Sequence, residues 1–446
     1  MCGIAGIAGR AGTPPHLTDA QVATMRDALA HRGPDGAGLL RRGSVVLAHR
    51  RLSVIDPTPA GAQPMVADDG PAGEWPARGG SGGVATSRLA PGHARYALVY
   101  NGELYNDAAL RAELAPVLAA RGQRFRTASD TETLLWALIA WGAEAMPRLR
   151  GMYAFAFHDA IEQRLVLGRD PLGIKPLYWW SGATGGGGDQ PALAFASEVR
   201  ALLRHPLIAK RPDAVTLSAY CTTIRTTLGE RTLFQGVRAV RPGEWLVFDL
   251  RQGATSDGPS AAPGSLTPAR VRWRWGGGDV LTPAVMDALR CGADNDAERV
   301  LRDIVDDSIA AHLRSDVPVC CLLSGGLDSS IIAARSSPRV PALRTYCAGA
   351  KPASRDIGGD DAPDAAASPD FAMASLVARA LGSDHTEAVV TRAHFAQRWP
   401  EMVRHYALPL STPNEVAINA VARAVRARGD VVALSGEGAD ELFAGY

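Results

Sequence analysis

The stretch Val317–Ser330, VPVCCLLSGGLDSS, decides the fold of the second half of this 446-residue chain. Its first seven residues, Val317–Leu323, form an almost unbroken apolar run, which is typical of a parallel strand that is covered on both faces. Ser324–Gly326 then predicts a sharp turn, after which Leu327–Arg335 has a helical pattern. A strand, a glycine turn and a helix N-terminus together form an anion site, because backbone N–H groups and the helix dipole both favour a phosphate.

The side chains around this turn suit ATP with Mg²⁺. Ser324, Ser329 and Ser330 supply hydroxyl donors, and Asp328 is placed to hold the Mg²⁺ that accompanies a polyphosphate. The stretch is not a Walker A loop, since it lacks GxxxxGK[ST] and no lysine follows the glycines. It resembles the pyrophosphate loop SGGxDS of ATP pyrophosphatases, which use ATP to adenylate a carboxyl or carbonyl oxygen. The alternative is an ordinary strand-to-helix turn whose Asp and Ser residues only cap the helix.

The composition is that of a soluble globular protein with room for two or three domains. Hydrophobic residues make up 46%, charged residues 21%, and a net charge of +1 gives no argument for nucleic acid or membrane binding. The six cysteines include no CxxC pair, and the N-terminus does not have the pattern of a signal peptide. No run approaches the ~20 apolar residues of a membrane span. We therefore expect a cytoplasmic protein with reduced thiols.

The chain begins MCGIAGIAG. Removal of Met1 would leave Cys2 with a free α-amine beside its own thiol. Such an amine, with a pKa of ~8, can act as the general base for the adjacent nucleophile, as in N-terminal nucleophile hydrolases.

Four further motifs follow in order. They are HRGPDG (His31–Gly36), AHRRLSVID (Ala48–Asp56), YNGELYN (Tyr100–Asn106) and SDTE (Ser129–Glu132). In this order, and with Cys2, they resemble the class II glutamine amidotransferase domain, the glutaminase half of asparagine synthetases. The resemblance covers about the first 200 residues and ends near FASEVRALL (Phe195–Leu203).

The resemblance implies a role for each of these residues. Cys2 would attack the glutamine side-chain carbonyl to form a γ-glutamyl thioester, while the Asn101 side chain and the Gly102 N–H form the oxyanion hole. The implied glutamine pocket consists of Arg51 for the α-carboxylate, Asp130 for the α-ammonium, and Asn101, Gly102 and Glu103 along its wall.

Each assignment has a purely structural alternative. Asn101-Gly102 could be the type I′ turn of a hairpin. Asp130 could be only the N-cap of a helix over Thr131–Trp141, or part of a cap formed by Ser129–Glu132. Arg51 could be a solvated strand residue.

A second Ser-Gly loop closes the chain. SGEGADELFAGY (Ser435–Tyr446) follows the apolar strand Val431–Leu434, and two such strand ends side by side form the ligand crevice of a parallel sheet. The string resembles the synthetase motif SGEGxDE. By that resemblance the nucleotide contacts are Ser435 and Gly436 together with Leu322, Ser324, Gly325, Gly326, Asp328, Ser329 and Ala348. Asp440 would share Mg²⁺ with Asp328, and Glu437 would lie near the acyl-accepting end. The alternative is an acidic helix N-terminus, which the dipole favours by itself.

The fold expected from these patterns is an α+β N-terminal nucleophile domain with αββα layers, followed by an α/β doubly wound parallel-sheet domain of the ATP-pyrophosphatase type. We predict a glutaminase domain at 2–206, a connector with a low-complexity insertion at 207–296, and a synthetase domain at 297–446. Gly/Ser/Pro-rich surface loops are expected at Gly70–Gly92 and Gly182–Asp189. The predicted regular elements are helices over 18–31, 131–141, 297–314, 371–381 and 415–428, and strands over 152–159, 164–170, 176–180, 343–349, 387–390 and 431–434.

Together the two halves resemble a glutamine-hydrolysing asparagine synthetase. In that family ATP·Mg²⁺ adenylates the aspartate β-carboxylate, and ammonia from glutamine attacks β-aspartyl-AMP to give asparagine and AMP. The implied partners are glutamine, aspartate and ATP, without nucleic acid or membrane, and a homodimer is left open. The rivals are an amidotransferase with another carboxylate acceptor, a β-lactam-synthetase-like cyclase and a protein that only binds its ligands. The cyclase is disfavoured because such relatives generally lack the nucleophile.

One departure from the family concerns the end of the sequence. The family's synthetase domain continues past SGEGxDE with a helical region that includes a lysine near the acyl-adenylate, whereas this sequence stops at Tyr446. None of Lys175, Lys210 and Lys351 matches that lysine in position. We therefore expect a truncated chain that hydrolyses glutamine and makes little asparagine.

Overall fold

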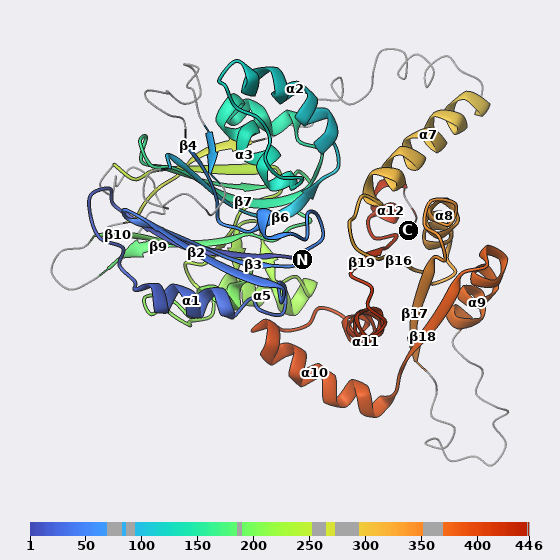
Figure 1. The fold of residues 1–446 in the computed structure, drawn as a ribbon. Helices are drawn as coiled ribbons and strands as arrows, with labels where there is room; N and C mark the ends of the chain where they lie inside the picture. Colours follow the sequence, from blue (N-terminus) through green and yellow to red (C-terminus); the bar gives the residue numbers. More distant parts are fainter. Residues whose placement is uncertain are drawn as a thin grey trace. The chain divides into compact units, whose positions relative to one another are not determined.

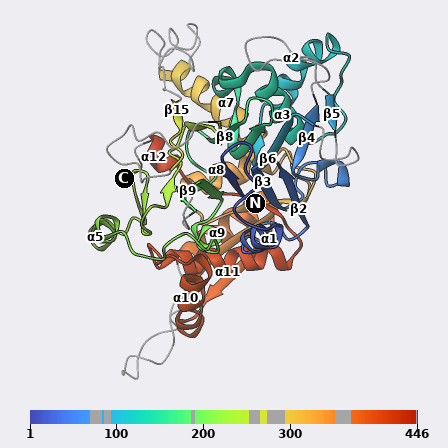
Figure 2. The same ribbon diagram turned by 90° about the vertical axis from the view of Figure 1, so that its left-hand side faces the viewer.

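The computed structural model describes residues 1–68, 83–85, 94–184, 190–251, 265–272, 294–350, 369–443 and 445. The chain divides into two compact units, Met1–Arg274 and Trp275–Tyr446 (Figures 1 and 2). Within the described ranges, no helix has the length and apolar character that a membrane crossing requires. Most of the two expected surface loops, at 70–92 and 182–189, lies outside the described residues.

The first unit contains two antiparallel sheets. The eight-stranded sheet has the order β11-β12-β13-β9-β10-β1-β3-β2 and the seven-stranded sheet the order β15-β14-β8-β7-β6-β4-β5. The strands of the first sheet are β1 (Gly3–Gly9), β2 (Gly36–Arg42), β3 (Val45–Arg51), β9 (Tyr178–Ala183), β10 (Pro191–Ala196), β11 (Thr227–Leu228), β12 (Arg231–Thr232) and β13 (Arg238–Ala239). Those of the second are β4 (Met65–Asp68), β5 (Gly83–Ala85), β6 (Tyr96–Leu104), β7 (Gly151–Asp159), β8 (Arg164–Arg169), β14 (Glu244–Asp249) and β15 (Ala269–Arg272).

Helices cover the outer face of each sheet. The helical segments of this unit are α1 (Asp19–Asp27), α2 (Asp107–Ala119), α3 (Asp130–Trp141), α4 (Val199–Leu202), α5 (Ala214–Thr223), η1 (Pro59–Gly61) and η2 (Gly142–Arg148). One apolar core joins α1 and α4 to the eight-stranded sheet, and another joins α2 and α3 to the seven-stranded sheet. A third core, which includes Ile4, Val99 and Phe248, fills the space between the sheets. The layers therefore run helix, sheet, sheet, helix, with α2 and α3 on one side and α1 on the other (Figure 1).

The first helix shows how local sequence sets an element. Thr18 and Gln21 have the spacing of a capping box; in the structure Thr18 is the N-cap of α1, and its hydroxyl and the Gln21 side chain form the reciprocal box. Val22, Met25 and Leu29 recur at helical spacing and are fully buried. The helix ends at Asp27, before the predicted end, because the next residues make tighter i→i−3 bonds such as Leu29 N–H to the Arg26 carbonyl.

Residues of the expected connector complete both sheets. β13 pairs with β9, and β14 pairs with β8, so the compact unit extends well beyond residue 206. Part of the expected insertion forms β15, which pairs with β14, while 252–264 and 273–293 lie outside the described residues. Glu244 on β14 is buried and forms ion pairs with Arg270 and Arg272 of β15. These pairs compensate the desolvation cost of the buried carboxylate.

The second unit is built on a four-stranded parallel sheet with the order β18-β17-β16-β19. Its elements are α7 (Asp294–His312), β16 (Val319–Leu322), α8 (Leu327–Ser336), β17 (Arg344–Ala350), α9 (Pro369–Leu381), β18 (Asp384–Val390), α10 (Arg392–Tyr406), α11 (Asn414–Ala427), β19 (Val432–Leu434) and α12 (Ala439–Phe443). Cys321, Ala333 and Phe371 share a core on the face of α8 and α9. Cys320, Tyr346 and Val421 share one on the face of α11. Helices therefore cover both faces (Figure 1), as the apolar run over Val317–Leu323 predicts.

Among the described residues, three histidines of the first unit are buried, and two of them lie in strands. His49 on β3 is 1% exposed and His158 on β7 is 2% exposed. Burial lowers the pKa of His49 to about 3 and that of His158 to about 4. Neither ring nitrogen of His158 has a hydrogen-bond partner among the described residues. Both imidazoles are thus held neutral in the folded unit.

This burial predicts a loss of stability in acid. A folded pKa below the usual ~6.5 gives stability that is fully present above pH ~6.5 and is lost as the pH falls toward the folded pKa. Each histidine should cost about 1.4 kcal/mol at pH ~5.5. His158→Leu should remove its share of this pH dependence, measured as hydrogen-exchange protection of β7 amides at pH ~7.5 and ~5.5. The exposed His394→Leu is the matched control, and an unchanged pH dependence in His158→Leu would contradict the prediction.

Candidate active site

The N-terminal cysteine precedes the central strand β1 and lies against the residue that follows Arg51. The Cys2 thiol donates to the Leu52 carbonyl at 3.5 Å, and the Leu52 N–H points back to the sulfur at 3.4 Å. Burial raises the pKa of the Cys2 thiol, while the Leu52 hydrogen bond and the positive charges of the terminal amine and Arg51 act against this rise. Burial is the largest of these effects, so the folded protein favours the neutral thiol, and a base must take its proton before the sulfur can attack.

Asn101 and Gly102 lie inside β6, where they pair with Ala154 and Tyr153 of β7. The hairpin-turn alternative is therefore wrong: the strand continues through the Asn-Gly pair to Leu104. Asn101 is fully buried, and neither its amide nitrogen nor its amide oxygen has a hydrogen-bond partner among the described residues. A buried amide without a partner is costly in a folded protein, and a bound ligand would satisfy it.

Asp130 lies beside this segment. Its carboxylate accepts hydrogen bonds from the Tyr100 hydroxyl at 3.0 Å and the Leu104 N–H at 2.9 Å, on either side of Asn101–Glu103. The N-cap alternative is also wrong, because Ser129 caps α3 and Asp130 is its first residue. The carboxylate is buried, and its position at a helix N-terminus favours the negative charge.

The Arg51 guanidinium is held by a loop. It donates to the Thr58 carbonyl at 2.7 Å, to the Ile55 carbonyl at 3.4 Å and to the Asp56 carbonyl. A Cβ on Gly61 would lie 2.2 Å from a guanidinium nitrogen, so glycine is needed for this approach. Arg51 is partly buried and fixed in place, unlike the solvated strand residue of the alternative.

Three residues near Cys2 received no catalytic assignment from the sequence. Arg32 donates to the Cys2 carbonyl at 2.9 Å and pairs with Glu198 at 2.9 Å. Lys175 is 4% exposed; burial lowers its pKa to about 8, and the nearby charges of Glu103, Asp170 and Cys2 oppose that shift. The signals that could have found them are the motifs HRGPDG, FASEVRALL and GRDPLGIKPLY, in which they occur.

The second unit brings its two Ser-Gly loops together. β16 and β19 are adjacent parallel strands, so the loops that follow them meet at the same edge of the sheet. A Cβ on Gly436 would lie 2.9 Å from the Asp328 Cβ and 3.4 Å from the Ser329 nitrogen. This is the point where the strand order changes direction, which is where open α/β sheets bind ligands.

The first of these loops is shaped by glycine and internal hydroxyl bonds. Gly325 has a φ of +82°, and a Cβ there would lie 2.6 Å from Met373 of α9. The Ser329 hydroxyl accepts the Ser324 N–H at 3.2 Å and lies 3.0 Å from the Ser324 hydroxyl. The Ser330 hydroxyl is buried without a partner among the described residues. These bonds hold the loop open at the N-terminus of α8.

The remaining predicted nucleotide residues fall on or near this edge. Leu322 and Ala348 pack against the same core on the α11 face of the sheet. Ser435 and Glu437 are exposed, whereas Asp328 and Asp440 are partly buried. Within the described ranges no three His, Cys, Asp or Glu side chains form a metal cluster, so a Mg²⁺ here would need phosphate oxygens or water beside the two aspartates.

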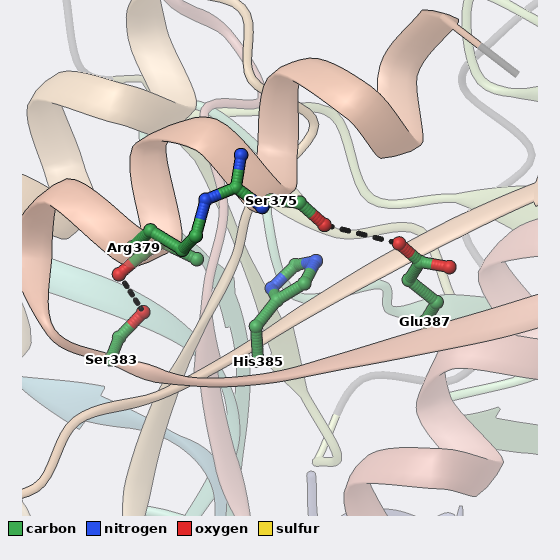
Figure 3. Close-up of a pocket in the computed structure, with 6 residues that line it drawn as sticks. Ser375, Arg379, Ser383, His385 and Glu387 are labelled. Atoms are coloured by element: carbon green, nitrogen blue, oxygen red, sulfur yellow. Dashed lines mark hydrogen bonds between the residues drawn. The ribbon is translucent and has the colours of Figure 1, made fainter. Parts of the chain in front are cut away.

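A separate pocket of about 350 Å³ lies between α9 and β18. It is lined by Ser375, Ala378, Arg379, Ser383, His385 and Glu387, and Figure 3 shows Ser375 directed toward Glu387, to which it donates at 3.1 Å. It contains none of the predicted residues. It lies along the amino-terminal half of β18, at the opposite end from the loops that follow the strands of this parallel sheet.

Comparison with known proteins agrees with the two-part geometry. The family model for the glutamine amidotransferase domain matches residues 1–73 and 88–257, and that for asparagine synthase matches residues 300–446. A Mycobacterium tuberculosis protein, named by inference as a glutamine-hydrolysing asparagine synthetase, is 34% identical over 100% of this chain and 60% of its own length. Asparagine synthetase 3 of Bacillus subtilis is 30% identical over 95% of this chain and 59% of its own length. Asparagine synthetase B of Escherichia coli is 28% identical over 94% and 60%.

A further relative carries a different name. The Penicillium rubens protein named amidase chyE is 28% identical over 100% of this chain. The chain spans about 60% of the length of the curated relatives it matches. A solved glutamine aminotransferase class-II domain protein from Silicibacter pomeroyi aligns with a TM-score of 0.27 and 13% identity, too distant to bear on the fold. The chain belongs to the family of the glutamine amidotransferase domain, which is followed in this sequence by a match to the asparagine synthase domain.

Proposed function

We propose that the first unit hydrolyses glutamine at Cys2 and that the second unit uses ATP to activate a carboxylate for amide formation. The observation that carries the proposal is the buried Asn101 amide, which has no hydrogen-bond partner among the described residues and lies between the two groups that bond Asp130. A glutamine would then have its charged ends on Arg51 and Asp130 and its side-chain carbonyl facing Asn101. Glu103 would line the same pocket.

The chemistry at Cys2 follows from these groups. After removal of Met1, the free amine of Cys2 takes the thiol proton, and the sulfur attacks the glutamine amide carbon. The Asn101 side chain and the Gly102 N–H stabilise the negative charge that develops on the carbonyl oxygen. The C–N bond breaks as the amine returns the proton to the leaving nitrogen, which departs as ammonia. Water then hydrolyses the thioester to give glutamate and restore the thiol.

In the second unit we assign ATP to the loops after β16 and β19. The glycine turn at Gly325-Gly326 and the N-terminus of α8 suit the phosphates, while Leu322 and Ala348 offer apolar contacts to the base. Ser435 and Gly436 approach from the second loop. Asp328 and Asp440 are the residues that would hold Mg²⁺, which when bound neutralises phosphate charge. Aspartate is the proposed acceptor: its β-carboxylate displaces pyrophosphate from ATP, and ammonia then displaces AMP to give asparagine. Glu437 lies on the second loop, where the acceptor end would be.

The two aspartates give a prediction for ligand binding. Asp328→Asn and Asp440→Asn should each weaken Mg²⁺-dependent ATP binding about tenfold, because each removes one anionic ligand. Glutamine hydrolysis should be unchanged, since these residues belong to the other unit. Titration calorimetry with ATP, with and without Mg²⁺, measures the effect. Asp384→Asn, an exposed aspartate paired with Arg428, is the matched control. Equal ATP affinity in all three variants would contradict the magnesium assignment.

The acceptor has a second candidate. The relative named amidase chyE favours a second candidate function, in which this chain acts on an acceptor other than aspartate. Incubation of the protein with glutamine, ATP and Mg²⁺, with and without aspartate, separates the two. Aspartate-dependent asparagine and pyrophosphate in equal amounts would support asparagine synthesis. Glutamate release without either product would favour another acceptor, and the absence of glutamate would overturn the glutaminase itself.

A further inference from the structure

The residue of interest is Asp56, the last residue of the motif AHRRLSVID, to which the proposed chemistry gives no role. Asp56 is 6% exposed and has a φ of +48°, a left-handed conformation that Asp and Asn tolerate better than most residues. The loop that contains Asp56 also supplies the three carbonyl groups that accept hydrogen bonds from Arg51. One of those carbonyls is Asp56's own.

The Asp56 carboxylate bonds in two directions. One oxygen accepts the Thr58 hydroxyl and the Thr58 N–H, the latter at 3.3 Å. The Thr58 carbonyl in turn accepts from Arg51 at 2.7 Å, so this oxygen fixes the part of the loop that grips the guanidinium. The other oxygen accepts the Ala128 N–H at 3.1 Å.

The bond to Ala128 connects Asp56 to the segment that contains Asp130, the proposed partner of the substrate's α-ammonium group. Ala128 is two residues before Asp130 and immediately before Ser129, the N-cap of α3. The rest of this turn is fixed by Glu132, whose carboxylate accepts the N–H groups of Arg126 and Thr127. A bond to Ala128 therefore acts on a stiff segment, and Asp56 connects that segment to the Arg51 loop across a separation of 72 residues.

We infer that Asp56 is a positioning residue that sets the distance between Arg51 and Asp130, and thereby tunes the pocket to an α-amino acid with both charged ends. The inference rests on the proposed glutaminase function. The carboxylate bonds described above run to Thr58 and Ala128, beside the two charged anchors, so the effect of Asp56 should fall on binding of the zwitterion and not on the chemical step.

The substitution Asp56→Asn removes the negative charge of the carboxylate. It keeps the size of the side chain and the tolerance of a positive φ. The amide still accepts from Thr58, but its NH₂ would face the Ala128 N–H, donor against donor. Asp56→Asn should therefore raise the KM for glutamine about tenfold, equivalent to ~1.4 kcal/mol, with kcat within about threefold. The Ki for L-glutamate, which carries the same two charged ends, should rise in parallel.

Two further measurements separate positioning from damage to the fold. The rate at which iodoacetamide alkylates Cys2 should match the wild type, since this small reagent needs no charged anchor. Asp56→Gly, which accepts the positive φ and lacks the whole carboxylate, should raise KM further than Asp56→Asn. Asp19→Asn, an exposed aspartate paired with Arg41, is the matched control and should leave both constants unchanged.

The outcomes are distinct. A parallel rise in KM and Ki with an unchanged alkylation rate supports the inference. An unchanged KM in Asp56→Asn, or a fall in kcat alone, overturns it while the proposed function stands. Absence of glutamate release from the wild type, measured in the same assay, overturns the proposed function instead. If Asp56→Asn does not fold, the comparison of Asp56→Gly with wild type in KM and Ki decides the question in the same way.

Discussion

Cys2→Ala should abolish glutamine hydrolysis, with a loss of about 10⁴-fold or more in kcat, because it removes the thiol that forms the thioester. The described cysteines other than Cys2 are Cys221, Cys320, Cys321 and Cys347; the last three are buried in the second unit, and Cys221 is exposed on α5. ATP binding should be unchanged, since the nucleotide loops belong to the other unit. Glutamate release and calorimetric ATP binding are the two measurements.

Cys221→Ala removes an exposed thiol from the same unit and should leave hydrolysis unchanged. Undiminished glutamate release from Cys2→Ala would contradict the assignment of Cys2 as the nucleophile. So would mass spectrometry that finds Met1 retained on a fully active protein, since the mechanism requires the free amine of Cys2.

Asn101→Ala should lower kcat by about 10²–10³-fold, equivalent to ~3–4 kcal/mol, with little change in KM. The amide is needed where charge develops on the carbonyl oxygen, and it contributes less to binding of the ground state. Since neither amide atom bonds to another described residue, the substitution loses no hydrogen bond, and the free energy of unfolding should change by no more than about 1–2 kcal/mol.

Asn106→Ala is the matched control from the same motif. Its amide is satisfied by Arg148 and Arg150 backbone groups, so the substitution should affect stability more than kcat. A loss in kcat of less than tenfold for Asn101→Ala, or an equal loss for Asn106→Ala, would show that the oxyanion assignment is wrong.

The parts of the fold that could be predicted from the sequence are those set by short local patterns. The capping box at Thr18 and Gln21 and the apolar run before Ser324 each act on neighbouring residues, so local pattern was sufficient. β13 has only two residues and β14 derives its place from pairing with β8, far away in sequence, so no local period marks them as parts of the two sheets.

The candidate site divides in the same way. Cys2, Arg51, Asn101 and Asp130 stand in recognisable motifs. In the structure the charges of Arg51 and Asp130 act on the Cys2 thiol, and Asp130 bonds the residues on either side of Asn101–Glu103. The Arg32–Glu198 pair and the Asp56–Ala128 bond join residues 166 and 72 positions apart. Such partners are chosen by tertiary packing, and the chemistry of a single motif cannot name them.

The strand order of the second unit has a consequence for how the protein is made. β16 is flanked by β17, which follows it directly, and by β19, which lies more than a hundred residues later in the chain. At ~5–20 residues per second a ribosome needs roughly 5–20 s to bridge that interval. Throughout it one edge of β16, including the backbone of Cys320 and Cys321, has no strand to pair with. An unpaired apolar edge invites association with other nascent chains. The growing polypeptide should therefore depend most on chaperones between the emergence of β16 and the docking of β19.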